Sequence, residues 1–285
     1  MDYTNSNALA ETQWLAANLD VPGVAVVDAT WYLPTADKDP RAEHEARHIP
    51  GAVYFDIDDI RAPDRALPHM LPTPETFAAK VGALGLSNAE RIVVYDANGG
   101  AGAAMRAWWM FRVFGHDDVA VLNGGLAKWL AEGRPTETGV AGPKPGRFTA
   151  KPRPHLVRDA SELLENLKSG AHQVVDARAA ERYAGTAPEP RPARKAGHIP
   201  GSLNLPYTQL IDAESDFTMR PADELATQFF GVGLDMARPV VASCGSGVSA
   251  AVLVFALYLL GHESAAVYDG SWSEWGNRDD TPVET

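Results

Sequence analysis

Cysteine is nearly absent from this sequence, because Cys244 is the only one among 285 residues. A single cysteine excludes a disulfide within the chain and any metal site built from several thiolates. We therefore expect no metal centre of that kind. If Cys244 is reactive, the chain offers no second thiol to react with it, so any thiol partner must come from outside.

Positive charge is also scarce. The chain has 25 Lys and Arg residues against 37 Asp and Glu residues, which gives a net charge of -12. Proteins that bind nucleic acid or anionic membranes need a basic face, so we expect neither kind of partner. An anionic substrate would have to be held by a local group of cations.

Long apolar runs are missing. The longest lies around residues 250–260, and a membrane-spanning helix needs about 20 apolar residues. The first residues, MDYTNSNALA, carry neither the basic and apolar segments of a secretory signal nor the arginines of a transit peptide. We expect a soluble, cytoplasmic protein.

What the sequence does contain is an internal duplication. RHIPGAVYFDI (47–57) is repeated as GHIPGSLNLPY (197–207), and FGHDDVAVLNGGLAKW (114–129) as LGHESAAVYDGSWSEW (260–275). VVDAT and IVVYD of the first half likewise match VVDAR and VVASC of the second, in the same order. Matches in one order at nearly one spacing predict two homologous domains rather than an array of short repeats.

A segment rich in proline and glycine, 134–154, separates the two halves and shows no apolar period. This composition is typical of an extended linker. The sequence therefore predicts a domain over 1–133, a linker over 134–154 and a second domain over 155–285.

Within each half, the pattern predicts strands that alternate with helices. We expect helices over 7–19, 74–85 and 104–114 and strands over 24–29, 91–95 and 119–122 in the first half. The corresponding segments of the second half are helices over 159–169, 222–233 and 248–260 and strands over 173–178, 239–243 and 265–268. A further strand is expected after each His-Ile-Pro-Gly motif, and a helical turn at the end of each half. Such alternation indicates an α/β fold with a mostly parallel sheet covered by helices on both faces. The charged stretch DKDPRAEHEARH (37–48) is expected to be a solvated loop.

Cys244 is placed where parallel sheets carry their sites, at the carboxyl end of the strand 239–243. It is followed by the loop GSGVS and a helix. The N–H groups of such a loop and the N-terminus of the helix stabilise an anion, so they can lower the pKa of a thiol. Gly245 and Gly247 leave room around the sulfur. The alternative is a buried, inert cysteine.

Two other readings of this loop remain. GSGVSA fits G-x-G-x-x-A, with Asp269 at a suitable distance for a dinucleotide site, although few residues follow Asp269. A cysteine phosphatase would need an arginine six residues after Cys244, where this chain has Ala250. Both readings are weaker than that of a reactive thiolate.

The sequence resembles the tandem-domain rhodanese family over nearly its whole length. The resemblance rests on the following segments: HIPGA, RAWWMFRVFGH, LNGG, GTAPEPR, GHIPG, YDGSW and above all CGSGVS. The cysteine loop is very similar to that of members that use 3-mercaptopyruvate, which usually end it in Thr where this chain has Ser249. Members that use thiosulfate carry basic residues where this chain has Gly245 and Ser246.

The resemblance implies sulfur transfer without a cofactor. Cys244 would take the sulfur of 3-mercaptopyruvate, a small 2-oxo acid thiol, as a persulfide and release pyruvate. Cyanide, an external thiol or reduced thioredoxin would then accept the sulfur. The alternatives are thiosulfate:cyanide sulfur transfer, a sulfur-relay protein that does not turn over a small donor, and a binding module with an unreactive Cys244.

The same resemblance implies roles for other residues. Arg182 and Arg191, in the loop after the strand that ends at Asp176, would bind the donor, together with Gly245, Gly247, Val248 and Ser249. A planar guanidinium suits a carboxylate with a neighbouring carbonyl. The alternative is that both arginines are solvated.

A proton relay proposed for the family would correspond here to His48, Asp39 and Ser246. A structural reading competes for each of these residues. The His-Ile-Pro-Gly motif occurs in both halves, which favours a structural turn at both histidines. This reading is stronger for His198, because the family's relay uses a histidine of the first domain, and it is also favoured for Asp39. The first half has Asp96 at the position of Cys244, so it would be catalytically silent. Arg106 could reach the cleft, and Trp272 and Trp275 are expected to pack.

Overall fold

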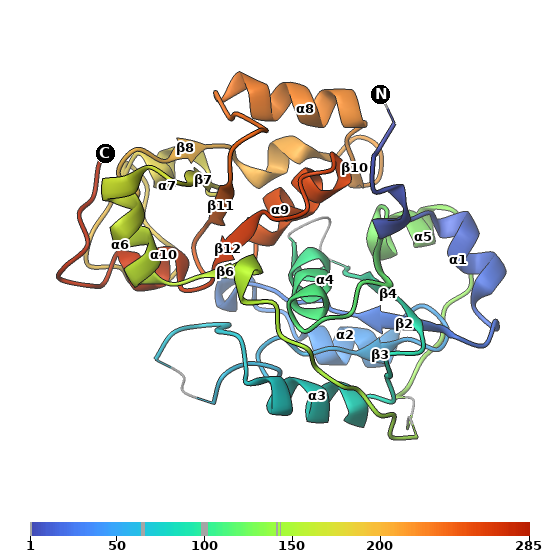
Figure 1. Ribbon diagram of the computed structural model, residues 1–285. Coiled ribbons are helices and arrows are strands. Elements are labelled where there is room, and N and C mark those ends of the chain that lie inside the picture. Colours follow the sequence, from blue (N-terminus) through green and yellow to red (C-terminus); the bar gives the residue numbers. More distant parts are fainter. Residues whose placement is uncertain (1, 64–65, 98–101, 141, 143) are drawn as a thin grey trace.

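The computed structural model describes residues 2–63, 66–97, 102–140, 142 and 144–285. Two five-stranded sheets carry the fold, one in each half, and every strand pair within them is parallel. The order is β1-β5-β4-β2-β3 in the first sheet and β6-β12-β11-β7-β8 in the second. Because these orders match strand for strand, the predicted duplication and α/β fold are confirmed (Figure 1).

The strands of the first sheet are β1 (Leu9–Ala10), β2 (Val24–Asp28), β3 (Val53–Tyr54), β4 (Arg91–Tyr95) and β5 (Val119–Leu122). Its helices are α1 (Thr12–Asn18), α2 (Pro40–Ala46), α3 (Pro74–Ala83), α4 (Ala103–Val113) and α5 (Gly125–Ala131). Short 3-10 turns lie at η1 (Ser6–Ala8) and η2 (Pro34–Ala36). The central strand β4 is a continuous apolar run, Ile-Val-Val-Tyr after Arg91, because helices cover both faces of the sheet and side chains on both faces are buried.

The strands of the second sheet are β6 (Val157–Arg158), β7 (Gln173–Asp176), β8 (Leu203–Asn204), β11 (Val240–Ser243) and β12 (Ala266–Tyr268). Its helices are α6 (Ala160–Ser169), α7 (Ala180–Tyr183), α8 (Ala222–Gly231), α9 (Ala250–Leu259) and α10 (Ser271–Trp275), with 3-10 turns η3 (Pro154–Leu156) and η4 (Tyr207–Leu210). An antiparallel hairpin, β9 (Ile211–Asp212) and β10 (Thr218–Met219), has no counterpart among the described residues of the first half.

Two sequence predictions about the first half are wrong. The helix expected over 7–19 covers only α1, because Leu9 and Ala10 pair with Val121 and Leu122 as an edge strand. The stretch expected to be a solvated loop contains α2, which starts with Pro40 at its first position and is capped by the carboxylate of Asp39. The buried His44 of α2 contacts Asp28 at the end of β2, which ties this helix to the sheet.

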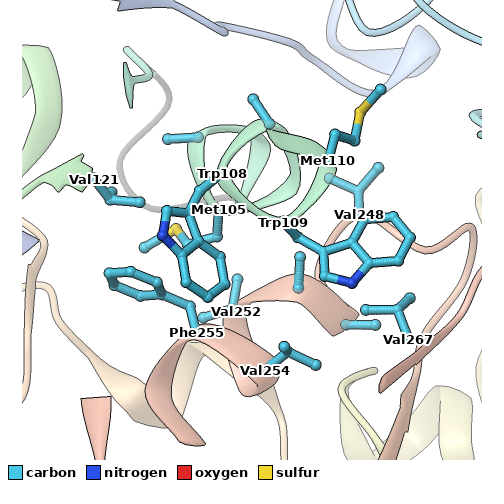
Figure 2. Packing of buried hydrophobic residues seen from close by; sticks show 14 of the residues in the cluster. Met105, Trp108, Trp109, Met110, Val121, Val248, Val252, Val254, Phe255 and Val267 are labelled. Atoms are coloured by element: carbon cyan, nitrogen blue, oxygen red, sulfur yellow. The ribbon is translucent and has the colours of Figure 1, made fainter. Parts of the chain in front are cut away.

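One apolar core joins the two halves. Helices α4 and α9 lie side by side at the centre of the molecule, and all the residues of α4 and nearly all those of α9 are buried. Figure 2 shows Trp108 and Trp109 of α4 directed at α9, where Trp108 meets Phe255 edge to face with ring centroids 4.8 Å apart. An apolar helix without a polar face fits this position, since α9 has no side toward water.

The segment between Arg134 and Arg153 has no helix or strand among its described residues, and it packs against the first half. Glu137 forms a β-bridge with His48, and the ring of Phe148 lies 5.6 Å from that of Phe77. Among the described residues, no helix has both the length and the apolar character needed to cross a membrane.

Candidate active site

Cys244 follows β11 directly and begins the loop that leads to α9. The residue is 1% exposed, and its backbone is fixed by two hydrogen bonds to the start of α10. Its N–H donates to Ser271 Oγ at 3.1 Å, and its carbonyl accepts from the N–H of Trp272 at 2.9 Å. Cys244 therefore begins, in a fixed backbone, the loop that leads to the N-terminus of the ten-residue helix α9, and the N-terminus of a helix favours anions.

The two glycines of this loop make close contacts for different reasons. A Cβ at Gly245 would lie 2.9 Å from Arg182 Nη2, so a side chain there would displace the guanidinium. Gly247 has a φ of 78°, and its Cβ would lie 2.8 Å from the carbonyl oxygen of Asp269. The loop therefore requires glycine at 247 for its backbone and at 245 for the space that Arg182 occupies.

A cavity of about 530 Å³ lies between the two halves with Cys244 in its wall. The predicted site residues that line it are Cys244, Gly245, Ser246, Val248, Ser249, Arg182 and Arg191. Gly247, in the same loop, does not line it. The first half contributes Trp31, Tyr32, Leu33 and Lys38, so the cavity is built from both halves. Its position at the carboxyl ends of the strands is the usual one for such sheets.

Arg182 is held by a buried ionic network behind the cavity. Its Nε and Nη2 both donate to Glu189, which also accepts from Arg178 Nη1 at 2.7 Å. Arg178 in turn pairs with Asp176 at the end of β7. This network fixes the arginine loop to the sheet, and sequence reasoning did not find Arg178 or Glu189.

Arg191 lies across the cysteine loop. Its Nη1 donates to Ser246 Oγ at 3.3 Å, and its Nη2 contacts His69 Nε2 at 3.0 Å. Burial lowers the pKa of Arg191, while the neighbouring Asp58 and Cys244 favour its charged form. An arginine remains protonated at neutral pH, so a partly desolvated cation is available beside the sulfur.

His69 and Asp58 extend this arrangement, and sequence reasoning missed both. His69 Nδ1 lies 3.3 Å from Asp58 Oδ1, and Asp58 also accepts from Trp31 Nε1 at 2.8 Å. Burial would raise the pKa of Asp58, but its interaction with His69, the hydrogen bond from Trp31 and the charge of Arg61 outweigh it and lower the pKa to about 2. Burial lowers the pKa of His69. A neutral ring with its proton on Nδ1 leaves Nε2 free to accept from Arg191.

His48 and Asp39, which were expected to form a relay with Ser246, do not line the cavity. Asp39 caps α2, and His48 Nδ1 contacts the carbonyl of His44 at 2.7 Å. His48 also forms a β-bridge with Glu137, and His198 forms the same bridge with Glu284 in the second half. The repeated motif thus ties a turn to the segment that follows the last helix of each half, which is a structural role. The structure places His69 and Asp58, rather than His48 and Asp39, beside Ser246 and Arg191.

Arg106 of the first half reaches the cysteine loop from behind. Its guanidinium is fully buried, pairs with Asp269 Oδ1 at 2.7 Å and donates to the carbonyl of Gly247 at 3.3 Å. It also donates to the carbonyl of His69. Asp269 is consequently engaged in a buried ion pair, which speaks against the dinucleotide reading because a ribose could not reach it.

The position of Cys244 is filled by Asp96 in the first half. The carboxylate of Asp96 is buried and accepts from the N–H of Ala104 in the first turn of α4 at 3.0 Å. Residues 98–101 of that loop lie outside the described part of the chain. Among the described residues, no group of three or more His, Cys, Asp or Glu side chains is arranged to hold a metal ion.

Comparison with known proteins gives consistent matches. The model of the rhodanese-like domain matches residues 11–132 and 159–278. Rat 3-mercaptopyruvate sulfurtransferase is 43% identical, with 94% of this chain and 91% of the rat protein covered. Bovine thiosulfate sulfurtransferase is also 43% identical, over 98% of this chain and 94% of its own. The crystal structure of SseA from Escherichia coli, a 3-mercaptopyruvate sulfotransferase, superposes with a TM-score of 0.85 at 38% identity and covers 94% of this chain and 99% of its own.

Proposed function

The chain belongs to the rhodanese family, with one rhodanese-like domain in each half, and on that premise we propose that it is a 3-mercaptopyruvate sulfurtransferase. The observation that carries the proposal is the position of Cys244. It lies in the wall of a cavity, before the N-terminus of α9, with Arg182 and Arg191 lining the same cavity. This arrangement suits a nucleophilic sulfur that attacks an anionic donor.

In the first half-reaction, the arginines hold the carboxylate and carbonyl of the donor. The thiolate of Cys244 attacks the thiol sulfur of 3-mercaptopyruvate, and the carbon–sulfur bond breaks. The electron pair goes to the carbon, which gives the enolate of pyruvate and then, after protonation, pyruvate. The persulfide that remains is stabilised by the N–H groups of the loop Gly245–Ser249, as an oxyanion hole stabilises an oxyanion.

Proton transfer is assigned here to Ser246 and His69. The Ser246 hydroxyl accepts from Arg191 and can donate its own proton toward the substrate. His69 holds the other end of Arg191, and Asp58 sets its tautomer. His48 and Asp39, whose contacts are structural, have no part in this proposal.

The choice of donor rests on the loop, since the mercaptopyruvate and thiosulfate relatives reach the same identity. Gly245 and Ser246 carry no charge, and the space above Gly245 is filled by Arg182. A second cation at 245 would lie against this guanidinium. The charges of this site are therefore placed for a 2-oxo carboxylate, and thiosulfate:cyanide sulfur transfer is the alternative.

The division of labour between the halves is part of the proposal. Residues 155–285 form the catalytic domain, 134–154 the linker and 1–133 a silent domain, because the carboxylate of Asp96 cannot form a persulfide. In the second half-reaction, cyanide or an external thiol takes the outer sulfur. Reduced thioredoxin is one such thiol, and the absence of a second cysteine in the sequence requires an external acceptor.

The test is the intact mass of the protein after brief exposure to 3-mercaptopyruvate or thiosulfate, with pyruvate release followed in parallel. We expect one added sulfur atom with pyruvate release, faster with mercaptopyruvate than with thiosulfate, and neither in Cys244→Ser. Loading by thiosulfate alone would keep the cysteine mechanism but reverse the choice of donor. No loading by either donor would favour a sulfur-relay or binding protein.

A further inference from the structure

We infer that the wall of the cavity contributed by the first half, together with Phe217, is an acceptor subsite for a thiol that has an aliphatic body and ends in a carboxylate. This inference rests on the proposed function, because it concerns the second half-reaction of the same cysteine. It assigns the silent domain a part in choosing the acceptor.

The cavity has two sides with different chemistry. The side formed by the second half holds the nucleophile, the Ser246 hydroxyl and the two arginines, and these polar groups are set among apolar residues such as Pro190, Tyr207 and Trp272. The side formed by the first half is apolar, with Trp31, Leu33, Ala36 and the ring of Tyr32, and Lys38 is the one charged residue that the described part of this half places there. A cavity of about 530 Å³ lies in the range that holds drug-sized ligands. A three-carbon donor held by the arginines leaves the apolar side unused.

Two large apolar side chains are left partly exposed at this cavity. Leu33 is 40% exposed and Phe217 is 37% exposed, although both line it. Phe217 and the preceding Asp216 have φ angles of 60° and 52°, a backbone conformation that residues other than glycine rarely adopt. Strained backbone that presents an apolar side chain to a cavity is a feature of ligand sites. These observations indicate an apolar contact for a second ligand.

Lys38 supplies the positive charge that would bind the carboxylate of the acceptor. Its Nζ lies 4.6 Å from the centre of the Tyr32 ring and 3.8 Å from Glu43 Oε1, and its side chain is half exposed. An ion pair of this length and exposure is weak. The ammonium group can therefore turn to a carboxylate that lies over Tyr32. An acceptor that reaches from Cys244 along the apolar side to Lys38 needs a thiol at one end and an anion at the other.

The chemical step needs no other reactant. The thiolate of the acceptor attacks the outer sulfur of the Cys244 persulfide, a new sulfur–sulfur bond forms, and the bond to Cys244 Sγ breaks. Cys244 leaves as the thiolate, and the acceptor becomes a persulfide that keeps its carboxylate. Cyanide takes the same sulfur as thiocyanate without touching the apolar side, so it serves as the reference acceptor.

The experiment measures the second half-reaction, the discharge of the loaded enzyme, separately from the loading step. The full chain is loaded with mercaptopyruvate, freed of donor and mixed with ω-mercaptoalkanoic acids of increasing length, with ω-mercaptoalkanols or with cyanide. The rate at which the extra sulfur mass disappears is followed. Each added methylene should raise the discharge rate constant about two- to fourfold until the thiol is long enough to reach Lys38. The free energy gained by burying one methylene group corresponds to a rate increase of this size.

Variants separate the apolar contacts from the charge. In Leu33→Ser and Phe217→Ser, the rate for long thiols relative to that for cyanide should fall about tenfold. Phe230→Ser is the matched control, because Phe230 is 82% exposed and does not line the cavity. In Lys38→Met, the preference for the acid over the alcohol should fall about threefold. Lys80→Met, which removes a lysine that does not line the cavity and pairs with Asp59, is the control for charge.

The two proposals can fail separately. If mercaptopyruvate does not load Cys244, inorganic polysulfide is used to load it, and the discharge test still applies. Discharge rates that do not depend on chain length, or that fall equally for cyanide in Leu33→Ser and Phe217→Ser, would overturn the subsite. So would a protein dithiol that discharges the enzyme faster than every small thiol and is indifferent to Leu33 and Phe217. A cysteine that no reagent loads would overturn both proposals.

Discussion

Gly245 and Gly247 stand two residues apart in the cysteine loop, yet they should respond differently to the same substitution. A methyl group at 245 meets only the end of the Arg182 side chain, which can move, whereas at 247 it meets the backbone of Asp269 with φ at 78°. Gly247→Ala should lower the free energy of unfolding by about 2 kcal/mol or more. Gly245→Ala should change it by less than about 1 kcal/mol.

The effect of Gly245→Ala should instead appear in the kinetics. Displacement of Arg182 misplaces the donor carboxylate, so we expect a rise of about tenfold in the KM for mercaptopyruvate. Urea denaturation and steady-state kinetics of both variants measure the two effects. A folded Gly245→Ala enzyme with an unchanged KM would show that Arg182 does not bind the donor.

His69 provides a test of electrostatics at the same scale. Burial lowers its pKa in the folded protein, so below about pH 6.5 the unfolded chain binds a proton at this histidine that the folded chain does not. The contribution of His69 to stability is therefore complete above about pH 6.5 and declines as the pH falls toward its folded pKa. Asparagine tolerates the φ of 59° found at this position, which makes His69→Asn a suitable variant.

We expect the stability difference between the wild type and His69→Asn to shrink as the pH falls from 7.5 to 5.5. Urea denaturation at several pH values measures it. Histidines elsewhere in the chain titrate in both proteins, so they cancel in the difference. Two parallel curves of stability against pH would contradict the buried, neutral state of His69.

At the scale of elements, the sequence predicted best where the structure repeats. The strands of 91–95 and 119–122 were found because β-branched runs in a covered parallel sheet are continuous. The two-residue edge strands β1 and β6 were missed, since two residues carry no periodicity and their pairing partners lie more than 100 residues away. Helix α2 had a local signal, Asp39 followed by Pro40, that the charge of the stretch obscured.

The site shows the same limit. Cys244 could be placed because it ends a strand and precedes a helix, which are local facts. His69 and Asp58 belong to the stretch between β3 and α3, where the two halves show no match, and long-range contacts alone bring them to Arg191. His48 was expected in a relay only because of the resemblance to the family, whereas the repetition of its motif indicated a structural turn, which its β-bridge to Glu137 bears out.

The buried ion pair between Arg106 of α4 and Asp269, which follows β12, links elements of the two halves, and its removal should be measurable. Arg106→Met keeps an aliphatic side chain beside the ring of Trp109 but removes the cation that faces the buried carboxylate of Asp269, which still accepts from the N–H of Leu71. A buried charge that loses its partner typically costs about 3–5 kcal/mol. We expect a loss of this size in urea denaturation, together with slower persulfide formation, since the carbonyls of Gly247 and His69 lose their donor.

The double variant Arg106→Met/Asp269→Asn is the control for this ion pair. It removes the uncompensated charge and keeps an acceptor for Leu71. It should be at least about 1 kcal/mol more stable than Arg106→Met alone. Strictly additive losses would show that the two charges do not interact across the domains.

For the whole molecule, the continuous core predicts that both halves unfold together. Five of the seven tryptophans belong to the first half and Cys244 belongs to the second, so fluorescence and the reactivity of the thiol toward a labelling reagent report on different halves. Because α4 and α9 bury most of their surface against each other and against both sheets, neither half can lose its structure without exposing the core of the other. The two probes should therefore give coincident urea transitions.

Trp108→Ala sharpens this prediction, because it removes the ring that meets Phe255 and Tyr258 across the domains. A cavity of this size in a core costs about 3–5 kcal/mol, and both probes should shift by the same amount. Trp129→Ala, in a separate apolar cluster of the first half, is the matched control for the loss of a buried ring. In a cooperative molecule it too shifts both probes. If either variant shifted the urea midpoint of the fluorescence transition but not the midpoint at which Cys244 becomes reactive, the two halves would unfold independently. The silent domain would then stabilise the cysteine loop only as long as it remains packed against the second half.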